Sequence, residues 1–457
     1  MDTVRINEKD NVCVNLETGH KIALCDIEQG ADVIKYGYPI GSATENICAG
    51  DPVHTHNMKT KLGAILSYAY TPNFQTLPPK ASFTINAYLR ENGDIGIRNE
   101  IWIVPTVGCV NSIAKRLAEK TGAIAFSHPY GCSQLGDDHK TTQLILRGLI
   151  RHPNAGGVLV LGLGCENNHI AEMKNVLGTW NETRVKFLAV QDCADEIETG
   201  VALIEALKET AAKDVRQAVP VSKLKIGLKC GGSDGLSGIT ANAVVGRVTD
   251  ALCAMGATAV LTEVPEMFGA ETVLFERCVS ETVFHKSVAL INNCKQYFKE
   301  HGQPVSENPS PGNKAGGITT LEEKSLGCIQ KGGTAPVVDV LDYGDTATKA
   351  GLNLLNGPGN DPVSITNLAA AGCHLILFTT GRGTPLGGAV PTIKIASNDK
   401  IAAKKPHWID ISAYGSDKDE KADALLHLIK QVADGACTKS ELLGSHEIAI
   451  FKDGVTL

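Results

Sequence analysis

The chain has 457 residues, of which 43% are hydrophobic and 20% charged, values that are ordinary for a globular protein of two or three domains. Its formal net charge of -7 argues against nucleic-acid binding, which usually requires a basic surface. No stretch approaches the ~20 consecutive apolar residues that span a bilayer, and the first residues do not resemble a signal peptide. We therefore expect a cytoplasmic protein without nucleic-acid or membrane partners, whose 14 cysteines are mostly reduced thiols.

Residues 1–70 are predicted to form a small β-rich domain. Short strands are expected at 12–16 and 21–24, and glycines recur at turn-like intervals through the rest of the segment. Near its end His54 and His56 alternate, so that a strand would point both imidazoles to the same face. Two such imidazoles suit a shared metal ion, or one ligand and one proton carrier, or two ordinary side chains on a half-exposed strand.

Residues 71–83 are rich in proline and show neither helical nor strand periodicity, which is typical of a linker. From residue 84 to 220, apolar strand runs alternate with helical stretches, and this alternation predicts an α/β domain with a parallel sheet. The expected strands cover 101–105, 123–126, 157–161 and 186–190, and the expected helices cover 112–120, 141–151 and 194–213.

Residues 221–457 are predicted to form a second domain of the same kind. The expected strands cover 225–229, 257–261, 335–340 and 374–378, and a surface helix is expected over 418–433. The sequence thus predicts an α/β protein, in which a small β-rich domain is followed by two parallel-sheet domains of Rossmann-like type.

Three cysteines follow the expected strands of the first α/β domain. Cys109, Cys132 and Cys165 each lie next to a glycine in the turn after a strand. In an open parallel sheet the loops after the strand C-termini converge on one crevice, so the three thiols are expected to meet there. Such a group favours a soft-metal or iron–sulfur site, although a single cysteine is usually a small buried hydrophobic residue.

Two further histidines bear on catalysis. His128 precedes Cys132 by four residues, so we regard it as the better candidate for a general base near the thiols. The spacing does not place His20, which could lie on a strand beside His54.

Glycine-rich turns in the second α/β domain are candidate anion sites. The turn 230–235 exposes backbone N–H groups to a carboxylate or phosphate, although a plain tight turn explains it equally well. It lacks the dinucleotide-binding spacing, which disfavours an NAD-dependent oxidoreductase. The turn 379–384 holds Arg382 between two glycines, where its guanidinium can grip a carboxylate bidentately. The loop 308–317 is interpreted as the lip of a site rather than as a disordered surface segment.

Several phrases of the sequence together resemble the altronate/galactarate dehydratase family. They are 49–57, 96–99, 128–138, 152–154, 164–168, 230–234 and the loops that begin at 308 and 381. The resemblance covers nearly the whole chain, and the 128–138 stretch is closer to the altronate branch than to the galactarate branch. It implies that residues 1–70 form a SAF-type domain.

The resemblance implies a metal-dependent hydro-lyase that dehydrates a sugar acid, D-altronate above all, to a 2-keto-3-deoxy acid. Ferrous iron or manganese (Mn2+) is implied as the metal. Galactarate and other aldarates or aldonates are alternative substrates, and a relative, a (2R)-sulfolactate sulfo-lyase, eliminates sulfite instead. In a 2,3-dihydroxy acid, a base must remove the C2 proton and a Lewis acid must assist loss of the C3 hydroxyl.

Two metal arrangements fit this chemistry. In one, the three loop cysteines hold a [4Fe-4S] cluster whose fourth iron binds the departing hydroxyl, and thiolate ligands favour it. In the other, a single Fe2+ or Mn2+ ion is held by His54, His56 and Glu166, and tolerance of manganese favours it. The base would be His128 or a member of the 54/56 pair.

The small-molecule substrate is expected to contact side chains of the glycine-rich loops. These residues are Arg382, Lys314, Asn313, Ser233 and Asp234. Two other classes of protein remain as alternatives. An iron–sulfur electron-transfer protein would be expected to have a shielded four-cysteine site, and a non-catalytic carbohydrate-binding protein would explain neither thiols nor histidines. A homodimer is allowed, and the linker permits either a hinged or a fixed N-terminal domain.

Overall fold

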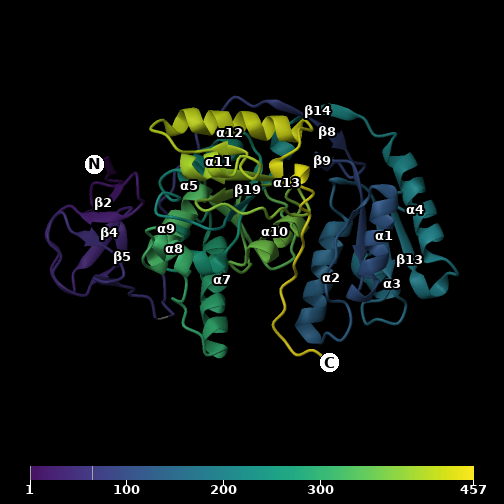
Figure 1. Ribbon diagram of the computed structural model, residues 1–457, viewed down its shortest axis with the longest axis horizontal. Coiled ribbons are helices and arrows are strands. Elements are labelled where there is room, and N and C mark those ends of the chain that lie inside the picture. The colour runs from purple at the N-terminus through teal and green to yellow at the C-terminus, as the bar shows by residue number, and fades with distance from the viewer. Residues whose placement is uncertain (1, 64) are drawn as a thin grey trace.

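The computed structural model describes residues 2–63 and 65–457, and it confirms the α/β fold class. Figure 1 shows three parts side by side: an N-terminal part (2–61) at the left, a C-terminal part (221–442) in the centre and an intermediate part (84–220) at the right. None of the helices in the described chain is both long and apolar enough to cross a membrane.

The N-terminal part consists of two small antiparallel sheets, and the strands expected at 12–16 and 21–24 are present. One sheet contains β1 (Thr3–Val4), β2 (Val12–Asn15), β3 (Lys21–Ala23) and β6 (Pro52–Val53). The other contains β4 (Asp32–Lys35), β5 (Tyr38–Ala43) and β7 (Met58–Lys59). Most buried apolar side chains of the N-terminal part belong to one continuous cluster that also contains side chains of the C-terminal part.

The prediction that His54 and His56 lie on a strand is wrong. Strand β6 ends at Val53, and both histidines lie in the turn that follows. Asn57 closes this turn, because its Oδ1 accepts from the backbone N–H of His54 at 3.0 Å and its own N–H donates to the carbonyl of His54 at 3.0 Å. An asparagine that bonds the backbone three residues earlier favours a turn over a strand.

The described residues of the connecting segment (62–83) form no helix or strand, but the segment is anchored on the C-terminal part. The hydroxyl of Tyr70 donates to the carbonyl of Cys278 at 3.0 Å, and the backbone N–H of Asn73 donates to the carbonyl of Glu276 at 2.8 Å. Around Tyr70 and Asn73 the segment is therefore held in place and does not form a free hinge.

The intermediate part is built on a four-stranded parallel sheet with the order β11-β10-β12-β13. The strands are β10 (Glu100–Pro105), β11 (Ile124–Ala125), β12 (Ala155–Gly162) and β13 (Val185–Ala189), and the helices are α1 (Asn111–Thr121), α2 (Gly136–Ile150), α3 (Ile170–Leu177) and α4 (Glu196–Ala211). Strand β11 pairs with one edge of β10, and the next strand, β12, pairs with the opposite edge. This reversal makes a topological switch point, where ligands bind in open α/β sheets.

The C-terminal part has a seven-stranded parallel sheet with the order β17-β18-β16-β15-β19-β20-β21. The strands are β15 (Lys225–Cys230), β16 (Thr258–Leu261), β17 (Val337–Leu341), β18 (Gly351–Leu355), β19 (Leu375–Thr380), β20 (Thr392–Ala396) and β21 (Ile411–Ser412). The helices are α5 (Ala241–Ala254), α6 (Glu271–Phe275), α7 (Glu281–Glu300), α8 (Pro311–Ala315), α9 (Leu321–Cys328), α10 (Asp361–Ala370), α11 (Asp399–Lys404), α12 (Lys418–Ala433) and α13 (Lys439–Leu442). Here the switch point lies between β15 and β19.

Helices cover both faces of the large sheet, and this explains the uninterrupted apolar runs of its strands. Strands β19 and β20 are buried along their whole length. A small antiparallel sheet, which the sequence did not indicate, joins the two α/β parts at the top of Figure 1. Its strands are β8 (Thr84–Leu89), β9 (Ile95–Gly96) and β14 (Arg216–Pro220).

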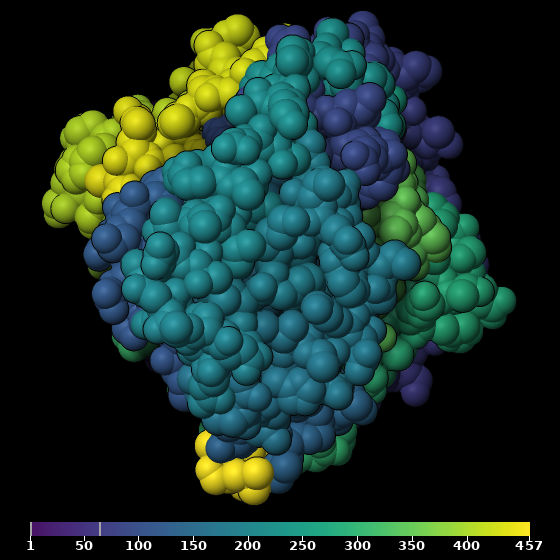
Figure 2. All heavy atoms as spheres, turned by 90° about the vertical axis from the view of Figure 1, so that its right-hand side faces the viewer, coloured from purple at the N-terminus to yellow at the C-terminus, as the bar shows by residue number. Residues whose placement is uncertain are grey.

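After α13, the C-terminal tail (443–457) crosses from the central part to the intermediate part. The backbone N–H groups of Asp453 and Gly454 donate to the carboxylate of Asp138 at 2.9 and 2.7 Å. The N–H of Leu457 donates to the carbonyl of Ser133 at 3.0 Å, next to Cys132. Figure 2 shows the yellow end of the chain against the lower edge of this part.

Candidate functional site

The three cysteine loops contact one another at the first switch point. The backbone N–H of Gly108 donates to the carbonyl of Tyr130 at 2.9 Å, and that of Asn168 donates to the carbonyl of Gly131 at 3.0 Å. The three thiols of these loops are all exposed. The loop of Cys132 also contains Ser133 at a φ of 57°, a left-handed conformation that the surrounding contacts must hold.

Glu166 stabilises these loops from within. Its carboxylate is buried and accepts from the Thr106 hydroxyl at 2.6 Å and from the backbone N–H groups of Leu163 and Gly164 at 3.0 and 2.6 Å. Burial alone raises the pKa of the Glu166 carboxyl, but these hydrogen bonds outweigh it and hold the pKa below its usual range. The carboxylate is therefore engaged in loop structure.

His128 is likewise engaged on both ring nitrogens. Its Nε2 lies 2.8 Å from the carbonyl oxygen of Pro105, and its Nδ1 accepts from the backbone N–H of Tyr130 at 3.2 Å. Burial lowers the pKa of the ring, so the imidazole is neutral. The prediction that His128 is the base is not supported by this geometry, because neither ring nitrogen is left for a substrate.

The structure does not bring the predicted ligands of a single metal ion together. His54 and His56 lie in the N-terminal part, whereas Glu166 lies in the intermediate part, and Figure 1 shows these parts on opposite sides of the C-terminal part. Over the described residues, no group of three or more His, Cys, Asp or Glu side chains is placed to hold a metal ion. A cluster on the three exposed thiols stays a prediction.

The predicted substrate-binding residues gather at the second switch point. Ser233 and Asp234 lie in the loop after β15, Arg382 in the loop after β19, and Asn313 and Lys314 on α8. The Asn313 amide donates to the carbonyl of Ser233 at 2.8 Å. The guanidinium of Arg382 donates to the carbonyl of Gly312 at 3.4 Å, so that three separate segments meet.

The loop 308–317 contains a short helix instead of being wholly irregular. Ser310 caps α8, since its Oγ accepts from the backbone N–H of Asn313 at 3.4 Å and the Asn313 side chain accepts from the N–H of Ser310 at 3.1 Å. This reciprocal pair is a capping box, with Pro311 at the first helical position. The sequence Ser-Pro-Gly-Asn carries this signal.

The N-terminal part adds two imidazoles to this site. The Nε2 of His54 lies 2.9 Å from the carbonyl oxygen of Lys314, and burial lowers the pKa of its ring. The ring of His20 lies 5.3 Å from the ring of His54, whereas His56 is exposed. Gly19 brings this turn close, because a Cβ at its φ of +77° would lie 3.2 Å from the carbonyl oxygen of Gly316. The pairing of His20 with His54 depends on tertiary packing, so the sequence alone did not place it.

Asp234 joins the loop after β15 to the loop after β20 rather than facing a substrate. Its carboxylate accepts from Ser237 at 2.8 Å, from Ser397 at 2.9 Å and from the amide of Asn398 at 3.0 Å. A Cβ on Gly381 would lie 2.3 Å from the Asp234 carboxyl carbon, so this approach requires glycine. We therefore assign Asp234 to positioning.

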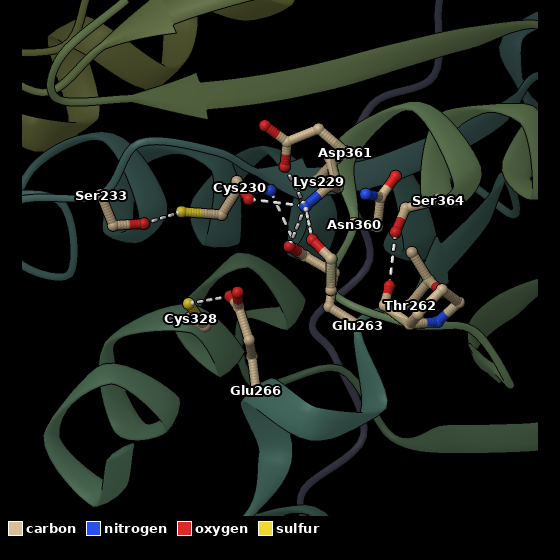
Figure 3. A network of polar contacts seen from close by, with 12 residues as sticks. Lys229, Cys230, Ser233, Thr262, Glu263, Glu266, Cys328, Asn360, Asp361 and Ser364 are labelled. Atoms are coloured by element: carbon tan, nitrogen blue, oxygen red, sulfur yellow. Dashed lines mark hydrogen bonds and ion pairs between the residues drawn. The ribbon is translucent and has the colours of Figure 1, made fainter. Parts of the chain in front are cut away.

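A buried ionic network lies beneath the same loops and was missed from the sequence (Figure 3). Lys229 pairs with Glu263 and lies 2.8 Å from the carboxylate of Asp361, and Lys331 lies 3.1 Å from Glu263. Burial raises the pKa of Glu263 to about 7, and its φ of 73° is left-handed. The sequence did contain one indication of this network: a lysine inside the apolar strand β15. A lysine that is buried in this way requires a charged partner.

Two thiols connect this network to the loop of Ser233. Figure 3 shows Cys230 pointing toward Ser233 and Cys328 toward Glu266. The distances are 2.5 Å from Cys230 Sγ to Ser233 Oγ and 2.9 Å from Cys328 Sγ to Glu266 Oε2. The adjacent Cys328 side chain and the nearby Lys331 ammonium lower the pKa of Cys230 to about 5, and the pKa of Cys328 is raised.

The second switch point therefore combines two imidazoles, a lysine and an arginine above a buried network of fixed charges. Cations of this kind bind carboxylate and hydroxyl oxygens, and a neutral imidazole is a suitable proton acceptor. The arrangement suits acid–base chemistry on a small polyhydroxylated acid.

Three family models match the chain in sequence order. They are the altronate/galactarate dehydratase SAF domain over residues 15–61, the second domain of D-galactarate dehydratase/altronate hydrolase over 87–212, and the C-terminal domain of D-galactarate/altronate dehydratase over 221–456.

Individual relatives align over almost the full length. An altronate dehydratase of Bacillus subtilis is 54% identical over 99% of this chain and 94% of its own length. One of Escherichia coli is 53% identical over 98% of this chain and 94% of its own length. The (2R)-sulfolactate sulfo-lyase of Chromohalobacter salexigens matches as two separate subunits. Its beta subunit is 32% identical over 80% of this chain and 97% of its own length, and its alpha subunit is 39% identical over 13% of this chain and 58% of its own.

Proposed function

Because the chain belongs to the altronate/galactarate dehydratase family and is a hydro-lyase, we propose that it dehydrates D-altronate to a 2-keto-3-deoxy acid. The observation that carries the proposal is that the His20–His54 pair and Arg382 both reach α8, the short helix that carries Lys314, at the second switch point. The identity to two altronate dehydratases supports altronate before galactarate or another sugar acid.

The proposed chemistry begins with binding of the substrate carboxylate. The guanidinium of Arg382 grips the carboxylate, and Lys314 and Asn313 orient the hydroxyls. The imidazole of His20 then takes the C2 proton, and His54 positions it, because both ring nitrogens of His54 are engaged with the carbonyl of Lys314 and the backbone N–H of Thr55. The C2–H electron pair forms the C2–C3 double bond as the C3–O bond breaks, and the departing hydroxide takes the proton now held by the imidazolium and leaves as water. The resulting enol tautomerises to the 2-keto acid.

We propose that the enzyme also requires iron, carried as a cluster by Cys109, Cys132 and Cys165 or as a single ferrous ion. Support comes from three exposed thiols on loops that contact one another. When bound, such a metal supplies Lewis-acid assistance to a leaving hydroxyl. Anaerobic purification with iron and sulfide analysis tests this requirement, and serine at all three positions is expected to abolish cluster content.

All 14 cysteines are unpaired, which supports a reducing, cytoplasmic location.

The function is tested by a keto-acid assay on the anaerobic, metal-loaded protein. We expect turnover with D-altronate, slower turnover with galactarate, and no sulfite from (2R)-sulfolactate. His20→Asn and His54→Asn should each lower kcat by about 10²–10⁴-fold, the usual contribution of a general base or its partner. His427→Asn, on the exposed face of α12, is the matched control. Failure to dehydrate any polyhydroxy acid, or sulfite release alone, contradicts the proposal.

A further inference from the structure

The N-terminal part rests on a face of the C-terminal part formed by residues 316–323 and the loop after β15. We propose that this face is a self-sufficient protein–protein interface, on which Glu323 holds the SAF-type part whether or not the two are covalently linked. Its binding test does not depend on the proposed function, and only the activity readout rests on it.

The centre of the interface is one carboxylate shared by two lysines. Glu323 on α9 lies 2.7 Å from the Nζ of Lys21 in β3 and 2.8 Å from the Nζ of Lys35 in β4, with all three side chains at most 1% exposed. Lys21 also donates to the carbonyl of Gly317 and to the hydroxyl of Thr319, both at 2.9 Å. The carboxylate thus reaches strands of both N-terminal sheets, and its removal would leave two buried ammonium groups uncompensated.

Around this centre, glycines of the C-terminal part approach the N-terminal part so closely that no Cβ atom would fit. A Cβ on Gly235 would lie 1.9 Å from the carbonyl oxygen of Gly19, and one on Gly317 would lie 2.4 Å from the same oxygen. A Cβ on Gly238 would lie 2.2 Å from the hydroxyl of Tyr36. A cavity lined by Lys35 and Tyr36 on one side and by Ser233 and Lys324 on the other has a volume of about 10 Å³, roughly enough for one water. The fit is therefore as close as that of a protein interior.

Polar contacts surround the charged centre. The hydroxyl of Thr320 donates to the carbonyl of Ile40 at 2.5 Å, and the hydroxyl of Thr60 donates to Glu322 at 2.9 Å. Outside the α9 region, Lys400 donates to the carbonyl of Glu17 at 3.0 Å. A desolvated core within a polar rim is the usual anatomy of a stable interface.

The covalent link lies away from these contacts. The connecting segment has its own anchors, and residues 78–82 beyond them are exposed. In the sulfo-lyase relative, the regions that match these two parts belong to separate subunits. We infer that the link raises local concentration but does not create the interface, and that the N-terminal part is fixed in place rather than acting as a lid.

The experiment uses the full chain with a protease site inserted between Leu62 and Gly63 and cut after folding, so that the anchored segment stays with the C-terminal piece. We expect the two pieces to co-elute in gel filtration at about 1 µM and to retain most of the uncut activity. Separate elution of the wild-type pieces at this concentration would overturn the proposal. Co-elution without activity in either cut or uncut protein would contradict the proposed function and leave the interface standing.

The variant Glu323→Gln tests the recognition element. It keeps the shape and removes the charge, so the dissociation constant of the cut pieces should rise at least about 100-fold. Asp214→Asn is the matched control, because Asp214 is also one carboxylate shared by two cations, Arg90 and Arg184, but lies within the intermediate part. Its pieces should stay together.

Two results would contradict the role of Glu323: unchanged affinity in Glu323→Gln, or equal release in Asp214→Asn. If Glu323→Gln does not fold, Lys35→Met is used, since it leaves the pair of Lys21 with Glu323 intact. A measurable loss of affinity between the cut pieces in Lys35→Met, smaller than that expected for Glu323→Gln, supports the proposal. Wild-type affinity in Lys35→Met opposes it.

Discussion

Arg382 stands between two glycines in the loop after β19, and its fork is held by the carbonyl of Gly312 on α8. Since a charge-assisted contact contributes about 1.5–3 kcal/mol, Arg382→Ala should raise KM for the sugar acid about 10–100-fold. Iron content should stay unchanged, because Arg382 lies in a loop of the C-terminal part, whereas Cys109, Cys132 and Cys165 lie in loops of the intermediate part. Steady-state kinetics with metal analysis checks this, and loss of iron would show that the assigned role is wrong.

Cys230 should be a thiolate at neutral pH. The adjacent Cys328 side chain and the buried ammonium of Lys331 lower its pKa to about 5. The difference in absorbance at 240 nm between wild type and Cys230→Ser should therefore titrate near pH 5. Cys278→Ser is the control, because that thiol is also buried but its pKa is raised by burial. A difference spectrum that titrates above pH 8 would exclude the thiolate.

At the residue scale, the sequence predicted the positions of the glycine-rich loops better than it predicted the hydrogen-bond partners of their side chains. Arg382 and Asn313 lie where the glycine-rich turns indicated. Asp234 and Glu166 are instead held by hydroxyl and backbone N–H groups, and sequence spacing carries no information on such partners. His20 was left unplaced because its neighbour belongs to a different strand connection.

At the scale of elements, the alternation of strand and helix predicted both parallel sheets, since buried parallel strands read as continuous apolar runs. Helix α12 has the bounds that the sequence indicated. The order of strands was not predictable, because each crossover can return to either side of the sheet. It is that order which sets the two switch points, and with them the two groups of candidate residues.

The contact between α2 and α10 gives a prediction at this scale. Gly148 lies in α2, and a Cβ there would come within 2.4 Å of the carbonyl oxygen of Ala370. Gly148→Ala gains up to about 1 kcal/mol of helix propensity but forces two helices apart, which typically costs about 1–3 kcal/mol. We expect a lower urea midpoint than wild type. Gly63→Ala, with no atom within 4 Å, is the control, and equal midpoints would contradict the prediction.

At the scale of the whole molecule, each α/β part presents one switch point, and a separate element reaches each of them. The N-terminal part brings His20 and His54 to the second switch point, and the C-terminal tail brings backbone groups to the loop next to Cys132. The geometry of both switch points therefore depends on how the two α/β parts are placed relative to each other. Buried histidines at their junction make this placement sensitive to acid.

His152 of the intermediate part and His374 of the C-terminal part lie at that junction, with rings 6.3 Å apart. The Nε2 of His152 lies 3.1 Å from the carbonyl oxygen of Cys373, and the Nδ1 of His374 accepts from the backbone N–H of Lys225 at 2.9 Å. Burial lowers the pKa of His152 from 6.5 to about 3 and lowers that of His374 in the same direction. The His152 ring is therefore neutral in the folded protein at pH 5 and protonated in the unfolded chain, and the shift of His374 acts in the same direction.

The sign of the pH dependence follows from this difference. A folded-state pKa below the unfolded value means that the unfolded chain binds more protons between pH 6.5 and about 3, so stability is full above pH 6.5 and falls below it. Each such histidine contributes a slope approaching ~1.4 kcal/mol per pH unit in this window. Urea unfolding of His152→Asn between pH 7 and 5 should show a shallower slope than wild type. The control His427→Asn, on an exposed face, should show the wild-type dependence of stability on pH. If His152→Asn shows the same dependence as wild type, the acid sensitivity does not come from His152.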